Sequence, residues 1–524
     1  MPLFPDAASV PTSLTTLVGD LARAGSPIQV RDGERTFTFA EIAADAERLA
    51  AGLARWGVGE GDHVAISMAN RVEWLHVWFA VARIGAVLVP LNTRFTEPEV
   101  GYVLRQGDVT HLIWEDGTGS LGAEAIGRLT AGEGVHLRGC AVLDGTPVAG
   151  AVALTDLYDE DTVPVREDGR ALGMIQYTSG STGFPKGAML TNAGLVRNGW
   201  GLGRAWQMTE HDVVLVANPL FHCGGSVFSF MAAVTSGAAT VLMRGWQLGA
   251  GLETMRAHAV TVAPVIDAAA RDLVLHAEST GETVSSLRLL STAADADLFT
   301  RVARSLGCEV SNVFGLTECS PNVCVGDLAD PIQERIDHIG RPQEGLTVDI
   351  RDPDSGRPVS LGDIGEIVVQ GEHSVMLGYY QNPDATARAF TADGFLRTGD
   401  LGRLCPDGRL DYCGRAKLMI KSGGENISIE EVESALRAHA AVADVIVAPV
   451  PHERFAEVGL AFLQPAAGAT LDPDEVLAWI RGTLAGFKIP KYAVVIDTFP
   501  RSGSGKVDRA SLTARAKDIV GTPS

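Results

Sequence analysis

The chain has few features of a redox, secreted or membrane-spanning protein. Its seven cysteines are scattered over 524 residues and no two have CxxC spacing, so the sequence predicts reduced thiols, with neither a zinc site nor a redox pair. The first ten residues contain no basic region followed by an apolar run, which argues against a secretory signal. The sequence also has no run of about 18 uncharged apolar residues, the length that a membrane-spanning helix needs. The chain ends in Gly-Thr-Pro-Ser rather than the peroxisomal Ser-Lys-Leu, so we expect a cytoplasmic protein.

Positive charge is also scarce. The chain has 43 lysines and arginines against 64 aspartates and glutamates, and its formal net charge is −21. An acidic surface repels phosphate backbones and anionic lipids, which argues against nucleic-acid or membrane-surface binding. Hydrophobic residues make up 46% of the chain and charged residues 20%, a balance that permits sizeable cores and does not indicate disorder.

Alternating helical and strand-like patterns predict an α/β fold. Residues 38–56 open with Thr38 and Glu41 at capping-box spacing and continue with apolar residues on one helical face. Short apolar runs at 63–67, 86–89 and 213–216 predict buried strands of mostly parallel sheets. We therefore predict a large N-terminal domain, residues 1–416, with layered sheets and helices. The remaining residues, 417–524, have the pattern of a small α+β domain.

The strongest local motif is a glycine-rich loop at residues 177–187, Tyr-Thr-Ser-Gly-Ser-Thr-Gly-Phe-Pro-Lys-Gly, which follows a strand-like run. Its glycines would let the backbone approach a ligand, and its hydroxyls with Lys186 would donate to phosphate oxygens. A flexible surface loop is the commoner reading of a Gly/Ser run, but the embedded Thr-Gly-x-Pro-Lys-Gly is more specific. The loop is not a Walker A motif, because Gly187 follows Lys186 where that motif has Ser or Thr.

Six segments in order resemble those of the adenylate-forming superfamily, which includes acyl-CoA synthetases, peptide-synthetase adenylation domains and beetle luciferases. The style of the motifs is closest to bacterial acyl-CoA synthetases. Besides the phosphate loop, they are Pro-Leu-Phe-His at 219–222, Asn-Val-Phe-Gly-Leu-Thr-Glu at 312–318, Thr-Gly-Asp at 398–400, a hinge and loop at 414–427, and a lysine loop at 500–509. Each match alone is weak, but their order over essentially the whole chain makes the resemblance specific.

The resemblance implies an AMP-forming acid–thiol ligase that uses ATP, Mg²⁺ and CoA. A carboxylate would attack the α-phosphate of ATP to give acyl-AMP and pyrophosphate, and the CoA thiol would then take the acyl group. The first transition state concentrates negative charge, so the site needs cations and fixed donors. The C-terminal domain would be mobile and would swing between the two steps. The partners would be a small carboxylic acid and CoA, with a carrier protein as an alternative acceptor, and a homodimer is compatible with the resemblance.

The resemblance also assigns roles to individual residues. The implied catalytic residues are Lys506, Thr317, Glu318 and His222, and the implied Mg²⁺ ligands are Glu318 and Thr182. The implied nucleotide-binding residues are Thr178, Ser179, Gly180, Ser181, Thr182, Gly183, Lys186, Ala293, Ala294, Asp295, Asn312, Phe314, Gly315, Asp400 and Arg415. The implied acyl pocket consists of Phe221, Cys223, Gly224, Val227, Phe228, Val265, Val313 and Leu316. The implied residues of the thioester step are Lys417, at the hinge, and Lys421, Ser422, Gly423, Gly424 and Glu425.

Two departures from the family pattern concern the substrate. Residues 291–296 read Ser-Thr-Ala-Ala-Asp-Ala, where relatives often have Gly-Gly-Ala-Pro or Gly-Ala-Ala-Pro, so Thr292 makes a bulkier wall. Amino-acid adenylation domains usually carry an aspartate after the phenylalanine of the gate segment, but here His222 follows Phe221. This argues against an α-amino acid substrate, and the apolar lining favours an acyl or aryl acid.

Three alternatives stay open. The acyl group could pass to a carrier-protein thiol or another acceptor, or the chain could perform adenylation alone. A luciferase-type oxygenase would use the same adenylate, although the missing peroxisomal signal argues against it. A silent binding protein on the same fold is the third, and the retained Lys506, Glu318 and Asp400 argue against that one. Taken singly, each of these residues would more often be an ordinary surface or turn residue.

Overall fold

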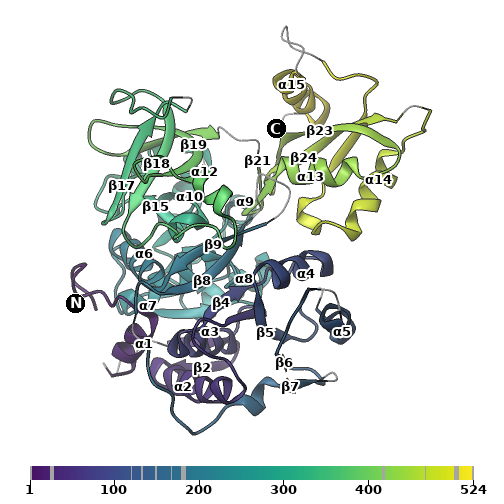
Figure 1. Ribbon diagram of the computed structural model, residues 1–524. Helices are drawn as coiled ribbons and strands as arrows, with labels where there is room; N and C mark the ends of the chain where they lie inside the picture. The colour runs from purple at the N-terminus through teal and green to yellow at the C-terminus, as the bar shows by residue number, and fades with distance from the viewer. Residues whose placement is uncertain are drawn as a thin grey trace. The chain divides into compact units, whose positions relative to one another are not determined.

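The computed structural model describes residues 3–23, 29–119, 121–131, 134–147, 150–166, 168–178, 185–294, 296–353, 355–415, 419–466, 468–500 and 507–521 (Figure 1). Contacts divide the chain into two compact units. The larger unit comprises residues 1–93, 103–177 and 187–416, and the smaller comprises 94–102, 178–186 and 417–524. The smaller unit thus includes two short segments from the N-terminal part of the sequence, which the sequence pattern did not predict.

Two sheets built mainly of parallel strands form the frame of the larger unit. The first, in spatial order, consists of β7 (Ala151–Ala153), β6 (Gly139–Leu143), β5 (Val109–Glu115), β3 (His63–Ser67), β4 (Val87–Pro90), β8 (Leu172–Thr178) and β9 (Lys186–Thr191). The second consists of β16 (Arg341–Pro342), β15 (Asn322–Val325), β14 (Glu309–Gly315), β13 (Leu289–Thr292), β12 (Val262–Pro264), β10 (Val213–Val216), β11 (Ala239–Leu242), β1 (Gln29–Asp32) and β2 (Arg35–Thr38). The α/β fold predicted from the alternating patterns is confirmed.

Helices accompany these strands along the chain (Figure 1). They are α1 (Leu14–Arg23), α2 (Phe39–Arg55), α3 (Val72–Ile84), α4 (Glu97–Gln106), α5 (Ala123–Ala131), α6 (Asn192–Ala205), α7 (Ala232–Ser236), α8 (Leu248–Ala257), α9 (Asp267–Thr280), α10 (Ala296–Leu306), α11 (Ile332–Asp337) and α12 (Pro383–Ala389), with short turns η1 (Leu154–Leu157), η2 (Gly224–Met231) and η3 (Thr317–Cys319). The predicted capping box of α2 is present, because the Thr38 side chain accepts from the Glu41 N–H and the Glu41 side chain accepts from the Thr38 N–H.

An antiparallel sheet completes the larger unit, with β17 (Leu346–Arg351), β18 (Gly365–Gly371), β19 (Leu396–Leu404) and β20 (Leu410–Arg415) in that order. The smaller unit carries β21 (Met419–Ser422), β22 (Glu425–Ser428), β23 (Val442–His452), β24 (Ala456–Pro465), β25 (Tyr492–Val495), α13 (Ile429–Arg437), α14 (Pro473–Trp479), η4 (Ile480–Gly482), η5 (Gly486–Lys488) and α15 (Arg509–Val520). Within the described residues, no helix combines the length and the apolar character needed to cross a membrane.

A buried cluster of charges joins the ends of strands in the larger unit. The Arg71 guanidinium donates to Glu115 Oε1 at 2.9 Å and to Glu73 Oε2 at 2.6 Å, and it also pairs with Asp144. The side chains of Arg71 and Glu115 are each only 6% exposed. Because buried charges are costly unless they are paired and hydrogen-bonded, this cluster must keep its partners.

Glu115 also holds the backbone just before Arg71. Its Oε2 accepts from the Ala69 N–H at 2.9 Å. Burial alone would raise the pKa of the Glu115 carboxyl, but the Ala69 N–H and the guanidinium groups of Arg244 and Arg71 outweigh it and lower that pKa. The carboxylate therefore stays ionised and fixes the connection between β3 and α3.

We predict that Arg71→Met destabilises the larger unit by about 3 kcal/mol, because it leaves Glu115 and Glu73 without a buried cation. This is the lower end of the usual cost, since a second guanidinium still binds Glu115. Urea unfolding followed by tryptophan fluorescence measures the change. Arg23→Met is the control: this guanidinium is 72% exposed and pairs with Asp20, so we expect a loss below about 1 kcal/mol. Equal losses in the two variants would contradict the role given to the cluster.

Candidate active site

Several of the predicted site residues directly follow neighbouring strands of the second sheet. Strands β10, β12, β13 and β14 run parallel in neighbouring positions, so their carboxyl ends share an edge, the usual place of ligand sites in α/β sheets. The segments that leave these ends carry the gate motif at 219–222, Val265, Ala293 with Ala294, and the residues 316–318. Sheet topology therefore brings together residues that lie up to about a hundred positions apart in the sequence.

A buried asparagine positions the segment that follows β10. The Asn70 amide donates to the Val216 carbonyl at 3.1 Å and to the Asn218 carbonyl at 2.8 Å, and its Oδ1 accepts from the Leu220 N–H at 2.7 Å. Asn70 is 2% exposed. It lies in the β3–α3 connection, so one side chain links the first sheet to the gate segment of the second. Sequence reasoning missed this residue because nothing local distinguishes it from an ordinary loop asparagine.

Two more buried amides complete the support of the gate. The Gln176 Nε2 donates to the Phe221 carbonyl at 3.0 Å. The Asn218 amide donates to the Pro264 carbonyl at 3.0 Å and to the Gly224 carbonyl at 3.3 Å. Asn218 thus ties the gate segment to the end of β12. Buried amides that are satisfied in this way specify one arrangement of the backbone.

The gate segment continues into η2, which is a π-helix, an element the sequence pattern did not predict. π-helical turns are rare and often lie at functional sites. Gly225 is required in its first turn, because a Cβ there would lie 2.2 Å from the Pro219 carbonyl oxygen. The element carries Val227 and Phe228, two of the residues expected to line the acyl pocket.

All of the expected acyl-pocket residues except Phe221 and Gly224 belong to three apolar clusters. One contains Cys223 and Val227 with Leu316 packed against it, another contains Phe228 and Val313, and Val265 lies in a third. Burial first, and the charge of Glu318 second, raise the pKa of the Cys223 thiol to about 12. This side chain is therefore a small neutral group beside the gate. That the expected residues line one acyl pocket together stays a prediction.

Phe314, Asp400 and a tyrosine lie together beside the antiparallel sheet. The Phe314 ring, which is buried, lies 6.0 Å from the Tyr412 ring at an interplanar angle of 38°. The Tyr412 hydroxyl donates to Asp400 Oδ1 at 3.2 Å. Asp400 is 5% exposed, and Arg415 lies opposite it on β20. An aromatic face beside a carboxylate can bind an adenine ring and ribose hydroxyls. Sequence reasoning treated Tyr412 only as part of a strand.

Glu318 lies in η3, directly after Thr317, and both are half-buried. Its Oε1 accepts from the Tyr379 hydroxyl at 2.7 Å, and its backbone carbonyl accepts from the Met376 N–H at 2.8 Å. Burial and the Glu318 charge raise the pKa of the Tyr379 phenol, so it donates throughout the normal pH range. A carboxylate oxygen is a ligand of the kind Mg²⁺ prefers, so Glu318 fits that ion. Tyr379 was also missed in the sequence.

The other residues expected to bind the nucleotide lie partly in the larger unit and partly in the smaller unit, and their role remains a prediction. Asn312, in the middle of β14, donates to the Ala294 carbonyl at 3.2 Å, just after β13, and Gly315 ends β14. In the smaller unit Thr178 Oγ1 contacts the Lys186 carbonyl at 3.5 Å. Outside the described residues lie Ser179, Gly180, Ser181, Thr182, Gly183, Asp295, Lys417 and Lys506.

Apart from Lys417, which is outside the described residues, the residues expected to act in the thioester step form the β21–β22 hairpin of the smaller unit. Lys421 and Ser422 end β21 and Glu425 begins β22. Between them Gly423 and Gly424 have φ values of +56° and +83°. A two-residue hairpin turn with both φ values positive favours glycine, so local structure accounts for this pair. His222 is half-buried, and its ring lies 6.5 Å from the Phe221 ring.

Comparisons with known proteins show the family and the fold of the chain. A family model described as AMP-binding enzyme matches residues 20–380, and one described as AMP-binding enzyme C-terminal domain matches 431–506. The chain is 35% identical over 489 residues to a feruloyl-CoA synthase of Amycolatopsis, covering 93% of this chain and 95% of that protein. It is 33% identical over 496 residues to a sulfoacetate–CoA ligase of Cupriavidus necator, covering 93% and 94%. A structure of o-succinylbenzoate CoA synthetase from Bacillus subtilis, a double mutant bound with a product analogue, matches with a TM-score of 0.82 at 27% identity, covering 95% and 98%.

We predict that Tyr379→Phe slows ATP-dependent pyrophosphate release about tenfold and raises the Mg²⁺ concentration required. A hydrogen bond to a charged group contributes about 1.5–3 kcal/mol, and its loss lets the Glu318 carboxylate turn away. A Mg²⁺ titration of pyrophosphate release measures the effect. Tyr380→Phe is the matched control, because its exposed hydroxyl bonds to Asp108 at 2.9 Å. An unchanged Mg²⁺ dependence in Tyr379→Phe would contradict the positioning role.

Proposed function

The chain belongs to the family of AMP-binding enzymes, and on that premise we propose that it joins a carboxylic acid to the thiol of CoA at the expense of ATP. In the first step the carboxylate attacks the α-phosphate of ATP, forming acyl-AMP and releasing pyrophosphate. In the second step the CoA thiol attacks the acyl carbonyl, and AMP leaves. The observation that carries the proposal is sequence identity above 30% to a feruloyl-CoA synthase and a sulfoacetate–CoA ligase, along nearly the whole length of each chain.

We assign the nucleotide to the edge where β14 ends. The Phe314 ring would contact adenine, and Asp400 would accept hydrogen bonds from the ribose hydroxyls. Tyr412 supports this assignment, because it contacts the Phe314 ring and donates to the Asp400 carboxylate. Thr317 and Glu318 would face the α-phosphate, and Lys506 would bridge it to the substrate carboxylate. Mg²⁺, when bound at Glu318, would neutralise phosphate charge, with Thr182 as a further ligand.

We assign the second step to the smaller unit. The family resemblance implies a hinge at Lys417 and a CoA-facing loop at Lys421–Glu425, which we adopt as part of the proposal. The β21–β22 turn supports this assignment. Its two glycines have no side chains, so CoA could approach the backbone closely there. His222 would move aside for the thiol. Transfer to a carrier-protein thiol is the alternative for this step, and a homodimer and a cytoplasmic location are further proposals.

The acid itself is proposed to be apolar, either acyl or aryl. The names of the two similar enzymes refer to acids of different character, a feruloyl group and sulfoacetate. The choice of acid in this chain is therefore assigned to the residues around the gate. Phe221, Cys223 and Val227 are all buried and apolar or neutral. A wall of this kind favours a hydrophobic chain or ring over a charged one.

The experiment that tests the proposal is a panel of carboxylic acids with two separate readouts, pyrophosphate release and acyl-CoA formation. We expect apolar acyl or aryl acids to give both products, and α-amino acids to give neither. Pyrophosphate without thioester would move the proposal to another acceptor. Absence of pyrophosphate with every acid would refute adenylation itself.

Lys506→Ala tests the proposed charge stabilisation. Loss of one positioned donor in a transition state typically costs about 3 kcal/mol, or about 10² to 10³ in rate, so we expect pyrophosphate release to fall by that factor. The variant should still convert a supplied acyl-adenylate and CoA to thioester, since the lysine would have moved away. Lys517→Ala is the control, because Lys517 is an exposed lysine of α15. Near-normal pyrophosphate release from Lys506→Ala would remove the residue from the proposal.

A further inference from the structure

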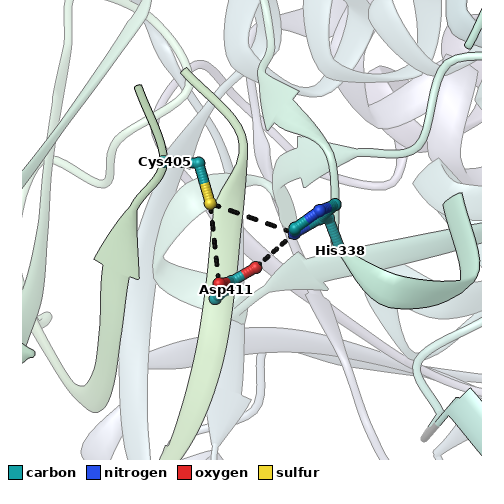
Figure 2. A group of neighbouring side chains, drawn as sticks. All are labelled: His338, Cys405 and Asp411. Carbon is teal, nitrogen blue, oxygen red and sulfur yellow. Dashed lines mark hydrogen bonds and ion pairs between the residues drawn. The ribbon is translucent and has the colours of Figure 1, made fainter. Parts of the chain in front are cut away.

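Three potential metal ligands meet in the larger unit, outside the residues assigned to the reaction. His338 caps the end of α11, Cys405 follows β19, and Asp411 lies in β20. Figure 2 shows their side chains pointing toward one another. His338 Nδ1 lies 2.5 Å from Asp411 Oδ1 and 3.9 Å from Cys405 Sγ, and this sulfur lies 3.5 Å from Asp411 Oδ2. One ligand atom from each residue lies within 4.8 Å of the others.

We propose that this group, the 338–405–411 site, binds one zinc ion. Imidazole nitrogen, thiolate sulfur and carboxylate oxygen together favour Zn²⁺, whereas Mg²⁺ and Ca²⁺ prefer oxygen alone. Zn–N and Zn–S bonds of about 2.0 and 2.3 Å add up to about 4.3 Å, which exceeds the 3.9 Å between His338 Nδ1 and Cys405 Sγ. One ion can therefore reach both atoms. Binding displaces the thiol proton of Cys405, which passes to solvent, and the ion takes the place of the contact between His338 and Asp411.

Neighbouring charges orient the ligands. Nε2 of His338 lies 3.5 Å from Glu334 Oε2, and a carboxylate at the far ring nitrogen is the usual partner of a metal-binding histidine. The Glu334 carboxylate favours the His338 tautomer that carries its proton on Nε2. In that tautomer the lone pair of Nδ1 can bind the metal. Arg403 Nε donates to Asp411 Oδ2 at 2.9 Å and so fixes the rotation of that carboxylate. The His338 side chain is 25% exposed and that of Asp411 is 13% exposed, so water can supply a fourth ligand.

The same geometry argues against a nucleophilic Cys–His–Asp triad. In a triad the carboxylate and the nucleophile contact different ring nitrogens, so that one orients the ring and the other exchanges a proton with it. Here Asp411 and Cys405 both approach Nδ1 of His338. Convergence on one nitrogen is the arrangement expected when an ion takes the place between the three groups.

The bound ion would join α11 to the hairpin of β19 and β20. That hairpin also carries Asp400 and Tyr412, the pair proposed to contact the nucleotide. Asp411 and Tyr412 are adjacent in β20, so their side chains point to opposite faces of the strand. Zinc on one face would therefore hold the strand whose other face presents Tyr412. The role inferred is structural, and it does not depend on the identity of the carboxylic acid.

Zinc titration of tag-free, metal-stripped full-length protein against a chromophoric chelator tests the site. We expect one high-affinity equivalent per chain, with affinity reduced at least tenfold in Cys405→Ser and in His338→Gln. Cys413→Ser is the matched control, because Cys413 is an exposed cysteine two residues after Asp411, and we expect it to keep wild-type affinity. Absence of a stoichiometric equivalent, or unchanged affinity in both ligand variants, overturns the proposal.

A second measurement uses the unaltered protein and so does not depend on the folding of any variant. Co²⁺ in the site should give a thiolate-to-metal absorption band, and Zn²⁺ should protect Cys405 from alkylation while Cys413 stays reactive, as peptide mass mapping would show. A bound metal without the sulfur band, or equal protection of the two cysteines, refutes the assignment. Pyrophosphate release measured on the same samples separates a failure of this site from a failure of the proposed function.

Discussion

The candidate site depends on the buried amide of Asn70, which joins the two large sheets. Its three hydrogen bonds, to the backbone of Val216, Asn218 and Leu220, set the path of the chain as it leaves β10. An amide at this depth cannot exchange these bonds for water without leaving polar groups unsatisfied. The position of Asn70 is fixed in turn by its two neighbours in the chain, because Glu115 binds both the Ala69 N–H and the Arg71 guanidinium. The buried charges of Glu115 and Arg71 thus help to determine where the gate residues lie.

Phenol hydroxyls hold two carboxylates of the candidate site in the same way. Tyr379 donates to Glu318 and Tyr412 donates to Asp400. A neutral phenol fixes the orientation of a carboxylate without cancelling its charge, which suits a group meant to bind a cation or ribose hydroxyls. Both tyrosines come from segments distant in sequence from their partners, 61 and 12 residues away. They are therefore part of the site only through the fold.

The β19–β20 hairpin carries residues of both proposed sites. One face presents the Asp400–Tyr412 pair, and Asp411 on the other face belongs to the 338–405–411 site. Arg403 and Asp411 are paired across the hairpin. The ion pair between the two strands therefore also orients the Asp411 carboxylate, a proposed zinc ligand. A rigid strand pair is a suitable base for nucleotide recognition, because contacts on rigid elements are held more accurately than contacts on loops.

The sequence by itself determined what depends on a few neighbouring residues. The capping box at Thr38 and the strands 63–67 and 213–216 were predicted and are confirmed. The ordered motifs also indicated the family. The π-helix after the gate, the amide of Asn70, the two tyrosines and the 338–405–411 site were not predictable, nor was the inclusion of residues 94–102 in the smaller unit. Local patterns report only the energetics of neighbouring residues, whereas these features arise from strand order and burial, which bring distant segments into contact. Only the tertiary structure could decide them.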